Sequence, residues 1–238
     1  MYIGPEFGYN EDLLFYYDPA NIKCYDGTNT MYNLGVSYSC DMTLYNSPVW
    51  SSDNMGVINL NGSTNEGRIP NLNYPFDTND PFTLQLWIYI PTGASWSNGY
   101  YGNMLSKGDY FGCVGLFRST ISDNKVYAFT RTDYVIKYCS SEMVRDKWTH
   151  ISMTMDITYG GTLSLYVDGI IKSSVATGFS YSLYENSNYI LAGKNALSGA
   201  YGNTMSGTFS CLSLWKKALS TTEIKKTYEM TKTRFGHI

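Results

Sequence analysis

This sequence has only two histidines, the side chain used most often in acid–base catalysis. The two histidines are His150, inside an alternating apolar stretch, and His237, next to the end of the chain. Metal hydrolases hold zinc with clustered ligands, often in an HExxH pattern, and the sequence has neither that pattern nor a third histidine. We therefore interpret His150 as a packed or hydrogen-bonded sheet residue and His237 as part of a frayed terminus.

The carboxylates form no recognisable catalytic pair. Glycosidases hold two carboxylates across the scissile bond, and in sandwich enzymes these lie on an E-x-D-x-x-E strand, which is absent. Glu142 and Asp146 lie four residues apart but flank a charged turn, which is typical of solvated surface. Nucleophile-elbow and phosphate-binding glycine motifs are also missing. We expect no enzymatic activity, with a glycoside hydrolase as the minor alternative.

Two loops combine aromatic rings with amides, the residue types that bind sugars. Stacking of a sugar C–H face on a ring, beside fixed polar groups, is a common mode of carbohydrate recognition. The alternative is that these rings pack on their own domain or at a subunit contact, an ordinary use in a chain with 23 tyrosines. The loops at 92–103 and 195–207 supply the candidate carbohydrate-binding residues Trp96, Tyr100, Tyr101, Asn103, Asn195, Tyr201 and Asn203.

Strands must position these loops. Residues 148–175 alternate apolar and polar side chains around turns at 159–161 and 168–169, which predicts a three-strand antiparallel meander. Residues 82–90 give the longest alternating strand. Burying one of its apolar side chains is worth about 1.5–3 kcal/mol, so this row decides which face points inward. We expect strand 82–90 to lie in the sheet that covers the apolar face of the meander.

The remaining pattern predicts an all-β fold. Further strands are expected at 13–17, 57–60, 104–107, 113–117, 125–130, 133–140, 189–192 and 208–215, whereas residues 22–50 look irregular. Ser220 and Glu223 form a capping box that starts a short C-terminal helix. We predict a two-sheet antiparallel β-sandwich of the jelly-roll type over residues 13–238, preceded by an arm or linker at 1–12.

Charge and composition exclude several other classes. The net charge is −3 and no basic block is present, which argues against nucleic-acid binding. No apolar run approaches the roughly 20 residues of a membrane span, and we see no secretory signal. The five cysteines lack CxxC spacing and suggest reduced, buried thiols of a chain that folds in a cytosol, although one or two disulfides stay possible. They are Cys24, Cys40, Cys113, Cys139 and Cys211.

Several motifs resemble, in order, those of concanavalin A-like, laminin-G-like domains in tailed-phage structural proteins. They are LFYYDPAN at 14–21, WTHIS at 148–152, LYVDG at 165–169, GTFSCLSLWKKALS at 207–220, and the closing Glu223, Ile224, Tyr228 and RFG at 234–236. Each motif is short, but their order holds from about residue 13 to the end of the chain. The resemblance implies a non-enzymatic virion structural protein that decorates a capsid, tail or fibre and is assembled in the host cytoplasm.

Partners follow from the same resemblance. We expect contacts with other virion proteins through residues 1–12, the loops and residues 234–236, and a homo-oligomer, for which a trimer would suit a capsid or fibre position. A lectin-like module that binds host-surface glycans during adsorption is the alternative. Related domains often bind calcium through carboxylates. The matching positions here, at 59–65 and 210–211, are mostly neutral, so we expect no cofactor.

Overall fold

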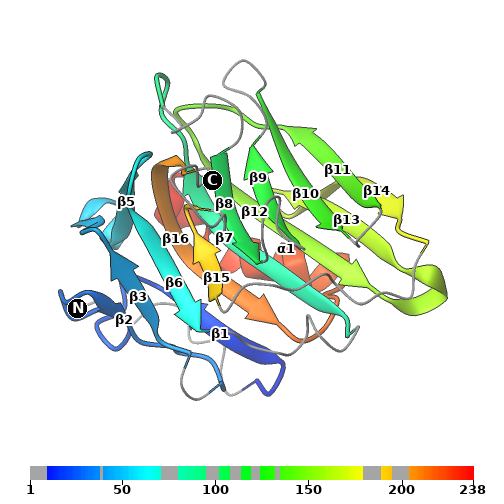
Figure 1. Cartoon of the computed structure of the whole chain (residues 1–238), viewed down its shortest axis with the longest axis horizontal. Helices are drawn as coiled ribbons and strands as arrows, with labels where there is room; N and C mark the ends of the chain where they lie inside the picture. Colours follow the sequence, from blue (N-terminus) through cyan, green and yellow to red (C-terminus); the bar gives the residue numbers. More distant parts are fainter. Residues whose placement is uncertain are drawn as a thin grey trace.

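The computed structural model describes residues 10–37, 40–70, 80–94, 102–107, 114–118, 124–131, 135–178, 189–194 and 204–238. Two antiparallel sheets pack face to face, and the helix α1 (Thr221–Thr231) lies against the outer face of one of them (Figure 1). This arrangement confirms the predicted two-sheet antiparallel sandwich with one short C-terminal helix.

Each sheet collects strands from distant parts of the chain. The first sheet has the order β14 (Ile170–Ala176), β13 (Thr162–Val167), β12 (Trp148–Asp156), β7 (Phe82–Tyr89), β16 (Ser206–Trp215), β5 (Val57–Asn61) and β4 (Val49–Ser51), and β1 (Leu13–Tyr17) also pairs with β16. The second sheet has the order β11 (Ile136–Glu142), β10 (Lys125–Arg131), β9 (Val114–Arg118), β8 (Gly102–Lys107), β15 (Tyr189–Ala192), β6 (Glu66–Pro70), β3 (Met42–Tyr45) and β2 (Thr30–Met31).

The apolar row of β7 faces the space between the sheets, as predicted. Leu84 and Leu86 are buried in one cluster with Leu105 and Leu116 of the second sheet. The expectation that this strand covers the meander was wrong, because β7 pairs with β12 in the same sheet and Leu84 lies opposite Met153. Alternation shows which face of a strand is inward, but it does not show which sheet the strand joins.

The stretch 22–50 contains more order than its sequence suggests. It includes β2, β3 and β4, so the prediction of an irregular excursion was wrong. These strands have only two to four residues, which is too short for a period of two to stand out. In β3 the buried residues Met42 and Leu44 still alternate with exposed ones.

The helix α1 begins at the predicted capping box. The Ser220 Oγ accepts a hydrogen bond from the Glu223 backbone N–H at 3.3 Å, and the Glu223 carboxylate accepts one from the Ser220 backbone at 2.8 Å. Polar contacts hold the helix on the outer face of the first sheet. The Gln85 side chain donates to Thr227 at 3.1 Å, and the Trp87 indole donates to Thr231 at 2.8 Å.

The residues after α1 fold back onto the same face through the 3₁₀-helix η3 (Lys232–Phe235). His237 is 9% exposed and contacts the Tyr228 hydroxyl at 3.0 Å and the Trp148 carbonyl at 2.8 Å, so the prediction of a frayed terminus was wrong. Arg234 and Phe235 are also buried, so they do not form the expected contact with a neighbour. They cover the outer face of the first sheet, where the Phe235 ring stacks 4.3 Å from that of Trp87.

The cysteines of the described residues agree with the expected redox state. Cys24, Cys40, Cys139 and Cys211 are all buried and free, while Cys113 lies outside the described residues. Burial raises the pKa of Cys40 to about 11 and that of Cys139 to about 12, which keeps both thiols protonated and unreactive. Among the described helices, none is long and apolar enough to cross a membrane.

Candidate functional site

One end of the sandwich gathers several turns, and we call it the loop end. It comprises residues 46–48, 61–65, 102–104, 193–194 and 204–205. Backbone hydrogen bonds join its parts: the Gly193 N–H donates to the Met104 carbonyl, and the Met205 N–H donates to the Gly193 carbonyl, both at 2.9 Å. The two loops predicted to bind sugar therefore begin or end at neighbouring points of the sandwich.

The candidate residues can be followed only in part. Asn103 lies on β8 opposite Phe117, beside a register shift, and its side chain is 4% exposed. The other six candidates lie outside the described residues, and their role stays a prediction. They are Trp96, Tyr100, Tyr101, Asn195, Tyr201 and Asn203.

A charged cluster at the same end was missed by the sequence analysis. The Glu66 side chain is 1% exposed and lies between two cations. It accepts a hydrogen bond from the Arg68 Nε at 2.9 Å and forms an ion pair with the Lys194 Nζ at 3.2 Å. Glu66 and Arg68 are two residues apart on a strand whose Ile69 points into the core, so their shared outer face could have been predicted. Their contact with Lys194 could not have been predicted, because Lys194 lies far along the chain.

An exposed aromatic ring adjoins this cluster. Tyr45 lies opposite Glu66 in the register of β3 and β6, and it is 38% exposed. The Arg68 guanidinium lies 4.0 Å from the centre of the Tyr45 ring, a cation–π contact worth about 0.5–1 kcal/mol at an exposed site. Because Glu66 fixes Arg68 from one side, the ring and the guanidinium form a preorganised platform.

Neutral amides tie the turns of the loop end together. The Asn61 Oδ1 accepts hydrogen bonds from the backbone N–H groups of Ser63 and Thr64 at 2.9 and 3.0 Å. The Asn46 side chain donates to the Thr64 carbonyl at 2.8 Å, and the Thr204 hydroxyl donates to the Gly62 carbonyl at 2.6 Å. These atoms are occupied by one another, so this donor set does not fit a calcium ion, which prefers several free oxygens including carboxylates.

Groups that could ligate a metal or act in acid–base catalysis are also sparse elsewhere. No cluster of three or more His, Cys, Asp or Glu residues occurs in the described part of the chain. His150 is buried beneath α1, and burial, with a smaller effect of His237, lowers its pKa to about 3. Asp146 accepts hydrogen bonds from Thr92, including one from its backbone at 2.7 Å, so it holds a turn. At the loop end, the carboxylate of Glu66 is already neutralised by two cations.

Comparisons with solved structures agree with the fold. The receptor binding domain of botulinum neurotoxin D aligns with a TM-score of 0.71 and 14% identity, over 93% of this chain and 53% of that one. The botulinum neurotoxin serotype D ligand binding domain in complex with N-acetylneuraminic acid aligns with a TM-score of 0.71 and 12% identity, over 92% of this chain and 51% of that one. The binding domain of botulinum neurotoxin DC in complex with rat synaptotagmin II aligns with a TM-score of 0.69 and 11% identity, over 94% of this chain and 52% of that one.

This chain thus spans about half the length of the structures it matches. At such low identity the likeness concerns the fold alone. A search of curated protein sequences finds no match. Among protein-family models, residues 61–225 match Laminin_G_3, described as the concanavalin A-like lectin/glucanases superfamily. That match covers more than half of the 238 residues, and the chain therefore belongs to the Laminin_G_3 family of concanavalin A-like domains.

Proposed function

We propose that the chain is a non-enzymatic binding domain whose loop end binds carbohydrate. The observation that carries this proposal is the platform of Tyr45 and Arg68, fixed by Glu66 and adjoining the roots of both aromatic loops. A sugar ring can stack on the part of the tyrosine ring that stays exposed, while its hydroxyl groups bond to the partly exposed guanidinium. The lectin members of the superfamily, and a structural neighbour solved with N-acetylneuraminic acid, support this class of ligand.

The setting we propose is the surface of a tailed-phage virion. The ordered motifs of the resemblance support it, and the four buried free thiols suit a chain assembled in the host cytoplasm. In that setting the ligands would be host-surface glycans recognised during adsorption. Mass spectrometry of purified particles of the phage that encodes this chain tests the assignment. Absence of the chain from the particles contradicts it.

The carbohydrate proposal is tested by a glycan array followed by titration of any glycan that binds. We expect Tyr45→Ala and Trp96→Ala each to weaken binding about tenfold, which corresponds to about 1.4 kcal/mol. Tyr32→Ala is the matched control, because Tyr32 is an exposed tyrosine that follows β2, and β2 pairs with the start of β3, away from Tyr45. An array without any bound glycan, or binding that none of the loop-end variants changes, contradicts the proposal.

Hydrolysis is the outcome that would contradict the non-enzymatic part. Glycoside hydrolases need two carboxyl groups about 5–10 Å apart, one of which must give up a proton. Glu66, the buried carboxylate of the loop end, is held in ion pairs with Arg68 and Lys194. Release of reducing sugar from a bound glycan, abolished by Glu66→Gln, would show that the domain is an enzyme.

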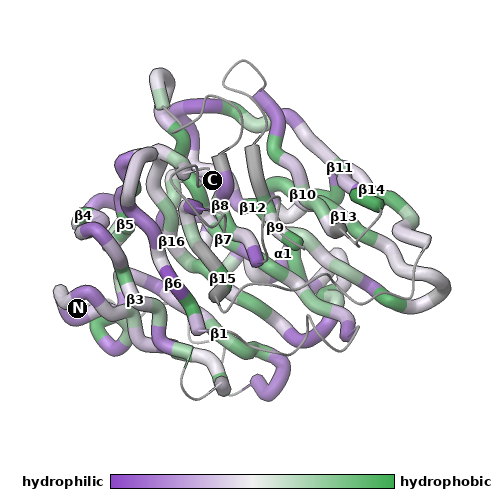
Figure 2. The backbone as a smooth tube through the Cα atoms, in the orientation of Figure 1, coloured by the Kyte–Doolittle hydropathy of each residue, from purple (hydrophilic) through white to green (hydrophobic). Residues whose placement is uncertain are grey.

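A second candidate function is assembly of several copies of this chain on the virion, and one rim of the sandwich favours it. The edge strands β11 and β14 contact each other there. Ile136, Tyr138, Ile170 and Ile171 are 47%, 59%, 57% and 45% exposed. Figure 2 shows β11 and β14 side by side at this rim. Unpaired strand edges with exposed apolar side chains are typical of protein contacts, and we propose a second copy of this chain as the partner.

The oligomeric state in solution tests this second candidate. We expect light scattering of the purified chain to show a homo-oligomer, a trimer being the form that suits a capsid or fibre. The double variant Ile136→Lys/Ile171→Lys should be monomeric, whereas Ile22→Lys, at a site that is 54% exposed on another turn, should not change the mass. A wild-type chain that stays monomeric at high concentration contradicts the contact.

A further inference from the structure

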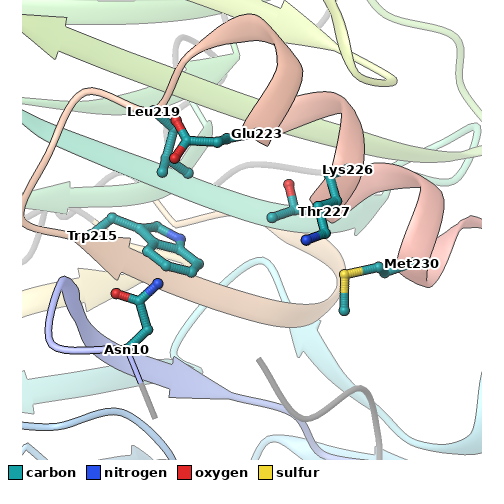
Figure 3. A pocket seen from close by; sticks show the side chains of 7 residues that line it. All are labelled: Asn10, Trp215, Leu219, Glu223, Lys226, Thr227 and Met230. Carbon is teal, nitrogen blue, oxygen red and sulfur yellow. The ribbon is translucent and has the colours of Figure 1, made fainter. Parts of the chain in front are cut away.

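A pocket of about 250 Å³ lies far from the loop end, where β16 finishes and β1 begins. It is bounded by α1 on one side and by the end of β16 on the other (Figure 3). Its lining residues are Asn10, Trp215, Leu219, Glu223, Lys226, Thr227 and Met230.

Part of the pocket wall is apolar. Trp215 is 4% exposed, and its indole N–H donates to the Ser213 hydroxyl at 3.2 Å, so towards the pocket it offers carbon atoms and no free donor. Leu219 and Met230 add aliphatic and thioether surface. The wall therefore suits a compact body with an apolar face, about the size of one substituted six-membered ring.

The acceptors in the pocket are already used. The Glu223 carboxylate pairs with the Lys217 Nζ at 2.7 Å and accepts from the backbone and hydroxyl of Ser220, both at 2.8 Å. Hydrogen bonding to Lys217 lowers the pKa of Glu223 to about 2, so this pair persists at neutral pH. The Thr227 hydroxyl donates to the Ile224 carbonyl and accepts from Gln85, which turns it away from a ligand.

Two donors face the pocket, and within the described residues their hydrogens have no other acceptor. The Asn10 Oδ1 accepts from the Asp12 backbone at 2.9 Å, which leaves the Asn10 Nδ2 group to donate. Lys226 contributes an exposed ammonium. Figure 3 shows both nitrogens pointing toward the space beside the Trp215 ring. A site that offers donors and a positive charge, with its only carboxylate neutralised, is complementary to an anion.

We propose that this pocket binds a small organic anion, a carboxylate carried on a ring-sized body with one apolar face. The apolar face of the ring would contact Met230 and the small exposed part of Trp215, and the carboxylate would accept hydrogen bonds from Lys226 and Asn10. This chemistry has two natural sources, an acidic sugar residue and an aromatic carboxylate. The inference does not depend on carbohydrate binding at the loop end, because it concerns other residues at the opposite end of β16.

Titrations of the full chain, followed by NMR, test the proposal with D-glucuronate, benzoate and D-glucose as probes. We expect saturable shifts of the Thr227 and Met230 amides and of the Trp215 indole with at least one carboxylate. Lys226→Gln should weaken that binding about tenfold, since a charge-assisted hydrogen bond contributes about 1.5 kcal/mol or more. Lys225→Gln is the matched control, because Lys225 is an exposed neighbour that does not line the pocket, and it should leave the affinity unchanged.

The probes separate the two sources. Binding of glucuronate without benzoate assigns the site to acidic sugars, and the reverse assigns it to aromatic carboxylates. Equal binding of neutral glucose, shifts confined to the loop end, carboxylate binding that Lys226→Gln leaves intact, or no saturable shift with any probe overturns the proposal. A failed glycan array with intact carboxylate binding here would contradict the loop-end function alone.

Discussion

Arg234 and Asp18 form a buried ion pair, with the Arg234 NH1 lying 2.7 Å from the Asp18 Oδ1 although 216 residues separate them. Their side chains are 3% and 0% exposed. The remaining guanidinium donors are also used: Nε bonds to the Asn54 carbonyl at 2.6 Å, and NH2 bonds to the Gly56 carbonyl at 2.6 Å. The pair fastens the C-terminal tail to the turn that follows β1.

Replacing Arg234 should strongly destabilise the fold. Arg234→Met leaves the Asp18 carboxylate buried without its cation, and we expect the free energy of unfolding in urea to fall by about 3–5 kcal/mol. The double variant with Asp18→Asn should recover part of this loss. Lys232→Met, which removes only the surface pair with Glu229, should have a much smaller effect. Equal effects of the two single variants would contradict a structural role for the buried pair.

Glu66→Gln should loosen the loop end. The amide cannot balance the charges of Arg68 and Lys194, but these side chains are 34% and 25% exposed and can turn to water. We therefore expect a smaller loss, about 1–3 kcal/mol in urea unfolding, together with faster hydrogen exchange at the Gly193 and Met205 amides. Glu142→Gln, at an exposed strand end, should change neither measurement. Unchanged exchange in Glu66→Gln would show that the cluster does not hold the loop roots.

The stability of the domain should decrease below neutral pH because of His150. Its folded-state pKa of about 3 lies below the unfolded value of about 6.5, so the unfolded chain binds more protons between these pH values. The contribution is fully present above pH 6.5 and decreases by at most about 1.4 kcal/mol per pH unit as the pH falls towards 3. His150→Phe should flatten this part of the profile of urea unfolding free energy against pH, whereas identical slopes would contradict it.

Removing the helix cap should cost a modest amount. Ser220→Ala deletes the acceptor for the Glu223 backbone N–H, and such caps are worth about 1 kcal/mol. Ser220→Asp keeps an acceptor at the N-cap and should restore most of the loss in thermal or urea unfolding. A Ser220→Ala variant as stable as the wild type would mean that the packing of Ile224 and Thr227 alone holds the helix.

Local patterns predicted the features that depend on neighbouring residues. The alternation of 82–90 gave the inward face of β7, and the spacing of Ser220 and Glu223 gave the start of α1, because both follow from geometry within a few residues. The pairing of β7 with β12, the burial of Arg234 and the docking of His237 depend on partners far along the chain. No local pattern encodes those partners, so these predictions were wrong or missing.

The candidate site also combines features that local sequence shows with features that depend on distant residues. Aromatic and amide residues in two loops were visible in the sequence, and the structure adds that the roots of these loops touch through Gly193, Met104 and Met205. The spacing of Glu66 and Arg68 was also visible, since alternate residues of a strand share a face. Lys194, which follows β15, completes the charged cluster, and Tyr45 on β3 completes the platform; only the sheet order brings them there.

The pairing of β1 with β16 has a consequence for biosynthesis. In the described sheets β1 has β16 as its strand partner, so β1 must wait for a strand that is synthesised much later than itself. Closing so long a loop costs entropy and slows folding. We expect nascent chains that stop before residue 206 to remain open to protease at β1 and to need a holding chaperone, whereas released full-length chains become resistant. The domain should therefore complete its fold only once β16 has left the ribosome.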